Sequence, residues 1–257
     1  MKYCLSVALL ALSICPSSLL ADSVEDTLLL YTKDYAHDPM LHDVTFGIQI
    51  GESDRWHVVA TRGEDGQPGN VTLNRGFPEQ PTWYFWFKDM DAFNAVDQGN
   101  MNAGTAMAKA FSTDSTPMDV EAMEGFQPDQ DFVANMMRTL FHFWNRGFPE
   151  IIPFDASTTR FTHGTDVTIF YYQPGFRSGW FSIKPGHHVN KDEKSRTNPF
   201  PSMMVFTKGE GTAIIGDEEI TVREGQTLFI PPEISHEILN RTDAPLEGVL
   251  LMFGDGA

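Results

Sequence analysis

The chain has 257 residues and carries 18 lysines and arginines against 35 aspartates and glutamates, a formal net charge of −17 at pH 7. A surface this acidic repels the phosphate backbone of nucleic acids and anionic lipid headgroups, so neither is expected as a partner. The length suits two modest domains, each with a core of its own.

The first 21 residues have the pattern of a secretory signal peptide. Lys2 gives a basic start, residues 5–14 form an apolar run, and small residues follow up to Ala21. The run is too short to span a membrane as a helix. A lipoprotein anchor on Cys15 and a buried N-terminal strand or helix are the alternatives. We expect cleavage after residue 21.

Cleavage there removes Lys2 and both cysteines, Cys4 and Cys15, and leaves 17 basic against 35 acidic residues, a net charge of −18. An exported protein without disulfides depends on its core alone for stability. These features favour the bacterial periplasm. No later apolar stretch approaches membrane-spanning length, so we expect no membrane span in the mature chain.

Residues 22–130 predict an α+β domain. Residues 44–50 place apolar side chains at every second position, which is typical of a half-buried strand. Residues 91–111 space theirs helically instead, with interruptions at Gly99 and Gly104. Further strands are expected at 55–61, 70–73, 81–87 and 118–123. Strands, then helix, then a closing strand predict an open α+β layer.

A family resemblance covers residues 43–124. Short amphipathic strands, an aromatic strand (TWYFWF), a helix ending in glycine and a small-residue helix follow one another, and this order resembles the sterol-carrier-protein domain. The resemblance implies a tunnel for an apolar ligand beneath the sheet. The alternative is an ordinary core, which we favour for each of Trp83, Phe85, Phe87, Met101 and Met107.

Residues 131–165 are expected to be a helix and a linker. Phe132, Met136, Leu140 and Phe143 recur at helical spacing, and Gly147 and Pro149 follow the pattern. The helix could bridge the two domains.

The hexapeptide NRGFPE occurs twice, at residues 74–79 and 145–150. A repeated turn is one interpretation, since glycine allows unusual backbone angles and proline fixes the next one. The other is that Arg75 and Arg146 clamp a carboxylate or phosphate.

Residues 166–257 read as short strands separated by regularly spaced turns. Turn signals stand at Pro174-Gly175, Pro185-Gly186 and Gly216-Asp217, and others follow at similar intervals. About eight strands at this spacing predict a jelly roll or small barrel.

One segment of this region carries a recognisable motif. Gly225 is followed after five residues by Pro231, then by His236 and Asn240, and this resembles the second motif of the cupin family (type 2). Glu233 occupies the position, two after the proline, where that motif usually has glycine. The fold class expected for the chain is therefore an α+β N-terminal domain followed by an all-β cupin-like jelly-roll barrel.

The resemblance also implies a metal site, which this sequence lacks in its usual form. The first cupin motif supplies two histidines and a glutamate, but these positions fall near Asp192, Lys194 and Ser202. Only His236 matches the family's ligand set. A catalytic transition metal needs about three protein ligands, so His236 alone could not hold one.

A rearranged site for a divalent transition metal stays open. His188, or its neighbour His187, could join Asp192 and His236. Adjacent strand residues face opposite sides, so at most one of the two neighbours points into the barrel. The alternative is that no cofactor is bound.

Without a metal, the barrel still offers a pocket for a small molecule. The residues expected to line it are Trp180, Ser182, Met204, Phe206, Phe229 and His236. We therefore expect an exported protein that binds an apolar or mixed-polarity ligand. The alternative is a metal-dependent cupin enzyme, an oxygenase, isomerase or lyase. The resemblance also makes a homodimer plausible.

Overall fold

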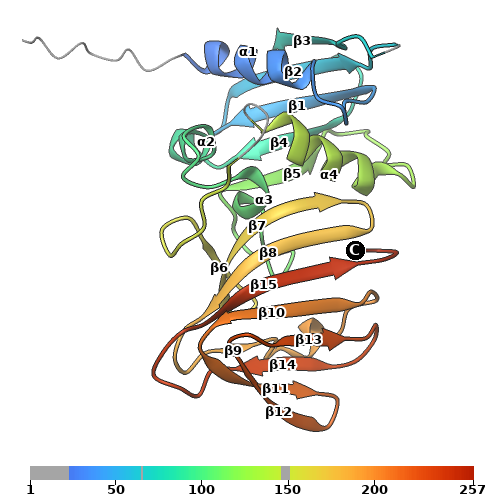
Figure 1. The fold of residues 1–257 in the computed structure, drawn as a ribbon. Coiled ribbons are helices and arrows are strands. Elements are labelled where there is room, and N and C mark those ends of the chain that lie inside the picture. The colour runs from blue at the N-terminus through green and yellow to red at the C-terminus, as the bar shows by residue number, and fades with distance from the viewer. Residues whose placement is uncertain (1–22, 65, 146–150) are drawn as a thin grey trace, which may run out of the picture.

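The computed structural model describes residues 23–64, 66–145 and 151–257. The predicted signal peptide and most of the second NRGFPE segment lie outside these residues. The chain forms an N-terminal α+β region stacked end to end on a β-barrel (Figure 1). No helix within the described ranges is long and apolar enough to cross a membrane.

The N-terminal region is a five-stranded sheet with helices on one face. Its strand order is β3-β2-β1-β4-β5, with β1 and β4 parallel and the other neighbours antiparallel. The elements in chain order are α1 (Val24–Tyr35), β1 (Val44–Ile50), β2 (Asp54–Thr61), β3 (Asn70–Arg75), β4 (Trp83–Phe87), α2 (Met90–Asp97), α3 (Ala103–Ala106), β5 (Met118–Ala122) and α4 (Phe132–Phe143).

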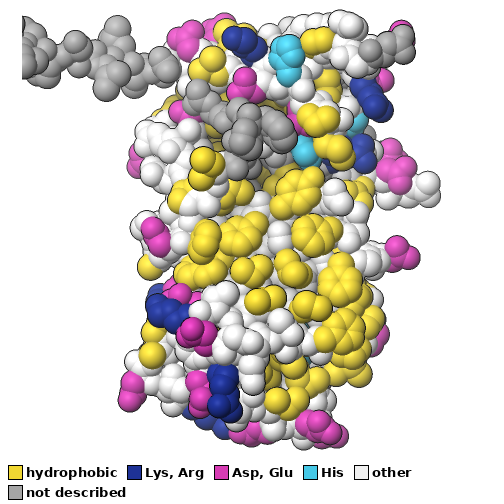
Figure 2. All heavy atoms as spheres, viewed as in Figure 1, with side chains coloured by type: hydrophobic (Ala, Val, Ile, Leu, Met, Phe, Trp, Pro, Cys, Tyr) yellow, Lys and Arg dark blue, Asp and Glu magenta, His cyan; other side chains and the backbone are white. Residues whose placement is uncertain are grey.

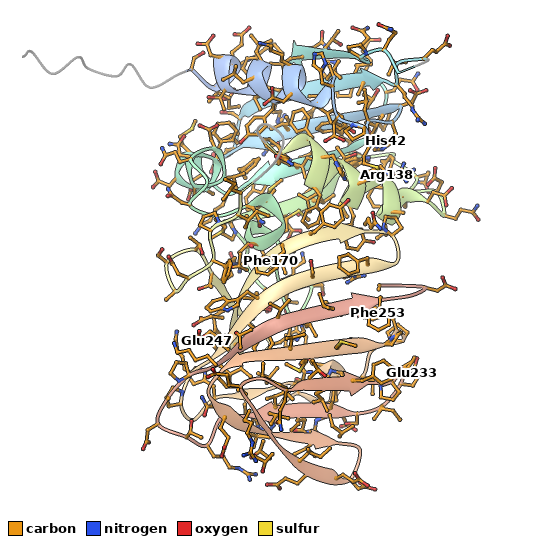
Figure 3. All side chains as sticks on the ribbon, in the orientation of Figure 1. His42, Arg138, Phe170, Glu233, Glu247 and Phe253 are labelled. Atoms are coloured by element: carbon orange, nitrogen blue, oxygen red, sulfur yellow. The ribbon has the colours of Figure 1, made fainter. Side chains whose placement is uncertain are left out.

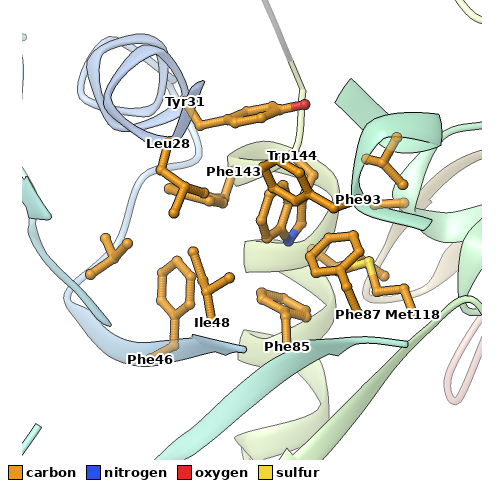
Figure 4. Close-up of a cluster of buried hydrophobic side chains, with 14 of the residues drawn as sticks. Leu28, Tyr31, Phe46, Ile48, Phe85, Phe87, Phe93, Met118, Phe143 and Trp144 are labelled. Atoms are coloured by element: carbon orange, nitrogen blue, oxygen red, sulfur yellow. The ribbon is translucent and has the colours of Figure 1, made fainter. Parts of the chain in front are cut away.

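Aromatic rings fill the space between this sheet and its helices (Figure 4). Phe143 on α4 is fully buried, and its ring lies 5.0 Å from that of Phe46 and 5.6 Å from that of Tyr35. Phe85 and Phe87 on β4 are fully buried in the same cluster. The sterol-carrier resemblance stays a prediction, but the aromatic strand serves the core, as the alternative reading held.

Helix α4 belongs to this core as well. Leu140 and Phe143 are 1% and 0% exposed within the N-terminal cluster. The sequence predicted a helix and linker at 131–165, and the structure assigns the helix to the N-terminal core. Periodicity gives the buried face of a helix but not the core that receives it.

The first NRGFPE segment ends β3 with Asn74 and Arg75 and bends at Gly76. Gly76 has a positive φ of 81°, which glycine adopts without strain. The Arg75 guanidinium lies 4.2 Å from the centre of the Trp56 ring and 2.9 Å from an Asp54 carboxylate oxygen. Arg75 therefore already has a carboxylate partner within the chain.

Two sheets form the barrel. The larger has the order β13-β10-β15-β8-β7-β6, and the smaller has the order β12-β11-β14-β9. Their inward side chains make a second hydrophobic core, separate from the N-terminal one. The α+β region and the β-rich barrel confirm the predicted fold class. The elements are β6 (Arg160–Thr162), β7 (Thr165–Gln173), β8 (Phe176–Ile183), β9 (His188–Val189), the short 3₁₀ helix η1 (Glu193–Ser195), β10 (Ser202–Lys208), β11 (Glu210–Ile215), β12 (Glu218–Arg223), β13 (Thr227–Ile230), β14 (His236–Leu239) and β15 (Leu246–Phe253).

The two regions meet where β7 passes beneath α3 and α4 (Figure 1). The register of β7 on β8 shifts between Ile169 and Tyr171. There the Ile169 N–H donates to Thr105 Oγ1 at 2.7 Å, and its carbonyl accepts from Asn102 Nδ2 at 2.5 Å. Side chains of the N-terminal region thus form hydrogen bonds with backbone groups of the barrel.

Candidate functional site

The barrel encloses a cavity of about 250 Å³, here called the barrel cavity. This is several times the roughly 30 Å³ that one water occupies in the liquid. Much of its wall is apolar, and a few polar side chains also line it. The main apolar contributors are Phe181, Ile183, Met204, Ile230, Ile238 and Leu250.

His236 begins β14 and lines the barrel cavity. The residue is 7% exposed, and burial lowers the pKa of its imidazole below the ordinary value of 6.5. Its Nδ1 lies 3.1 Å from the Ile234 carbonyl oxygen. A carbonyl can only accept, so Nδ1 carries the proton and Nε2 is left as an acceptor. His236 is thus a neutral hydrogen-bonding group at neutral pH.

Two further polar residues of this wall have atoms without partners. Ser202 on β10 is 1% exposed, and its buried hydroxyl makes no hydrogen bond. Arg177 on β8 has a buried Nε without a partner, while one of its Nη atoms donates to the Gly256 carbonyl at 3.1 Å. Buried polar groups are nearly always paired, so these two are the atoms a ligand would satisfy.

A second cavity of about 330 Å³, here called the junction cavity, lies between the barrel and the helices of the N-terminal region. Met107, Met137, Leu140 and Phe141 contribute its helical side. Six residues border both cavities, which therefore adjoin. They are His163, Val167, Arg177, Phe181, Leu250 and Met252.

The structure divides the six predicted pocket residues between the two faces of the sheets. Met204 and His236 line the barrel cavity, and Phe206 lies in the barrel core on the same face. Trp180 packs against Phe154, with ring centres 5.7 Å apart, and borders the junction cavity. The other two are turned away: Ser182 lines an outer groove and Phe229 is 52% exposed.

The same alternation separates the predicted metal ligands. Val189 points into the barrel cavity, so its neighbour His188 points outward, where its Nε2 lies 2.6 Å from a Glu237 carboxylate oxygen. Asp192 is exposed and accepts from the Lys194 N–H as the cap of η1. His187 stacks edge-on against Phe161.

These donors do not fit a catalytic metal. Across the described residues, no group of three or more His, Cys, Asp or Glu side chains is placed to hold one. His163 and His236 line the barrel cavity, and no carboxylate of the described chain accompanies them there. A site of this kind needs about three ligands.

Sequence reasoning did not select Arg177 and Ser202 as pocket residues. Ser202 occupies the position of the missing glutamate ligand, and it shares the inward face with Met204, two residues on. Extending that alternation would have found it. Arg177 follows a hairpin turn, and nothing in the sequence gives its facing. His163 lies in a turn with a positive φ of 51°.

The motif segment adopts the geometry that its residues suggest. Gly225 has a φ of 79°, and Glu233, in the usual glycine position, has a φ of 61°. Glu233 lies in the loop between β13 and β14 (Figure 3). Asn240 is 1% exposed, and its Nδ2 donates to the Ile183 and Ala244 carbonyls, both at 2.7 Å. Asn240 therefore ties β14 to the end of β8.

Residues 179–252 match the family model of the cupin domain. This part of the chain is a cupin domain. Solved structures similar to the chain include a cupin 2 conserved barrel domain protein from Salinispora arenicola CNS-205, with 16% identity, a TM-score of 0.37 and coverage of 42% of this chain and 91% of that one. The plu4264 protein from Photorhabdus luminescens has 15% identity, a TM-score of 0.36 and coverage of 40% and 87%. A comparison with curated proteins found no match.

The outer face of the cupin domain's larger sheet is apolar. Hydrophobic side chains gather there over β8, β15 and β10 (Figure 2). Val205 pairs with Val249, and Met203 pairs with both Leu251 and Phe229. We call Met203, Val205, Phe229, Val249, Leu251 and Phe253 the outer apolar face.

Proposed function

We propose that the chain is an exported protein that binds a small molecule in the barrel cavity of its cupin domain, with an apolar body that extends into the adjoining junction cavity. The observation that supports this most is the cavity itself, with its apolar wall and the unpartnered hydroxyl of Ser202. Ligand sites commonly combine such a wall with a few polar groups that orient the ligand.

Filling the cavity tests the proposal. Met204→Trp places a large ring inside the barrel cavity, whereas Met203→Trp makes the same change on the outer apolar face. Native mass spectrometry of the purified chain, with an apolar fluorescent probe as a second readout, should show ligand or probe on the wild type and Met203→Trp. Met204→Trp should lose at least tenfold in probe affinity. Equal binding by all three proteins, with circular dichroism confirming the fold, would overturn the proposal.

Export to the periplasm is part of the same proposal, since the basic start and apolar run of residues 1–14 support a signal peptide. Cell fractionation followed by N-terminal sequencing tests it. Periplasmic protein beginning at Asp22 is expected. Cytoplasmic protein that keeps Met1 would contradict it.

The alternative is a cupin enzyme that uses a divalent transition metal. The cupin domain itself favours this alternative, and the donor set around His236 weighs against it. Metal analysis of protein purified without chelators separates the two. A stoichiometric metal that His236→Ala abolishes would favour the enzyme.

A further inference from the structure

We infer that the ligand is an organic carboxylate, whose head group Arg177 holds where the two cavities adjoin and whose apolar tail lies in the junction cavity. The inference rests on the proposed function and specifies the class of ligand. The main evidence for the inference is the position of Arg177, which borders both cavities.

The charges around the cavities favour an anion. The chain has a net charge of −17, yet no aspartate or glutamate of the described residues lines either cavity. Lys109 and Arg177 are the fixed cations of the two linings, and Lys109 already has Asp119 at 2.6 Å. Within the described chain, no carboxylate forms an ion pair with Arg177. An anion would find a cation here, whereas a cationic ligand would find no counter-charge.

The Arg177 guanidinium is held in place while keeping donors free. It lies 5.1 Å from the centre of the Tyr172 ring and 5.3 Å from that of Phe200. A guanidinium has five N–H donors, and the chain uses one nitrogen, toward the Gly256 carbonyl. The buried Nε is unpaired. The planar fork of such a group fits the two oxygens of a carboxylate.

Ser202 supplies an independent polar contact in the same row of the sheet. Met252 on β15 pairs with Ser202 on one side and with Arg177 on the other. The three residues therefore stand side by side on adjacent strands, and all three line the barrel cavity. Strands lie about 4.8 Å apart, so roughly 10 Å separates the backbones of Ser202 and Arg177. A carboxylate over Met252 would be within reach of both side chains.

The junction cavity suits the tail. Its helical side consists largely of apolar groups, with Met107 and Met137 among them. Methionine side chains are flexible and adapt to irregular apolar shapes. Phe141 and Ile169 complete this part of the wall.

Three ligands that share one tail test the inference. Isothermal titration calorimetry of the full mature chain would compare decanoate, decanol and decylamine, each below its micelle concentration. We expect decanoate to bind at least tenfold more tightly than decanol, and decylamine to show no heat of binding. Arg177→Gln should bind acid and alcohol alike, while Arg75→Gln, a change in an exposed arginine of the N-terminal region, should keep the preference.

The outcomes separate this inference from the proposed function. If the wild type binds decanoate and decanol equally, the carboxylate assignment is overturned, while binding in the cavity stands. This comparison needs no variant, so misfolding of Arg177→Gln would not obscure it. If none of the three binds and Met204→Trp also leaves probe binding unchanged, both proposals fail.

Discussion

Glu233 occupies a backbone conformation that favours glycine, and replacing it with glycine should stabilise the cupin domain. Its φ is 61°, and its N–H donates to the Asn198 carbonyl at 2.8 Å, a bond that glycine would keep. A residue with a Cβ in the left-handed region costs about 1–2 kcal/mol. Glycine offsets about 0.5–1 kcal/mol of this through the greater freedom of its unfolded chain. The net gain expected for Glu233→Gly is about 0.5–1 kcal/mol.

Thermal unfolding followed by circular dichroism measures the effect. For a chain of this size, 1 kcal/mol shifts Tm by about 2–4 °C, so a rise of about 1–4 °C is expected. Glu233→Ala is the control, because it also removes one negative charge from an acidic chain but keeps the Cβ. If Glu233→Gly melts no higher than Glu233→Ala, the strain argument is refuted.

Three further predictions concern the core, the histidines and assembly. Phe143→Ala should lower the free energy of unfolding by about 3–5 kcal/mol, because the ring is fully buried, while Val133→Ala on the exposed side of the same helix should change it by less than about 0.5 kcal/mol in urea titrations. Burial lowers the pKa values of His42 and His236 below 6.5, so the unfolded chain takes up protons on these histidines at a higher pH than the folded chain does. The folded state therefore keeps its full stability from these groups above pH 6.5 and loses it as the pH falls through the lowered pKa values. Tm should therefore drop between pH 7.5 and 5, and the drop should be smaller in His236→Gln. An equal drop of Tm in His236→Gln and the wild type would contradict the burial argument. The homodimer stays a prediction, and light scattering should find a dimer that Phe229→Asp on the outer apolar face dissociates; a wild-type monomer at all concentrations would exclude it.

The sequence predicted the cupin fold because the fold depends on local signals. The glycine-containing turns and the spacing of Gly225, Pro231, His236 and Asn240 belong to short segments, and each works through the conformation of its own residues. The cupin domain at 179–252 confirms this part of the prediction. The sequence shows that Glu233 replaces the usual glycine of the motif. It does not show that the backbone of Glu233 is strained.

The candidate site depended on the facing of each strand, which the sequence leaves open. Alternation fixes that Trp180 and Ser182 share one face and that Met204 and Phe206 share another. It does not fix which of these faces is the inner one, since a slip of one residue exchanges them. Arg177 became a site residue only once its pairing with Met252 was known, whereas Ser202 shares the face of Met204, two residues on.

The hydrogen bonds to Ile169 affect the solubility of the barrel when it is separated from the N-terminal region. Only a short part of β7 is covered by β6, and beyond it Asn102 and Thr105 occupy the backbone groups of Ile169. A barrel separated from the N-terminal region would present this strand as an open edge, and open edges recruit strands from other molecules. A fragment of residues 166–257 is therefore expected to aggregate, and a barrel transferred to another chain would need a neighbouring region with side chains equivalent to Asn102 and Thr105 to stay soluble.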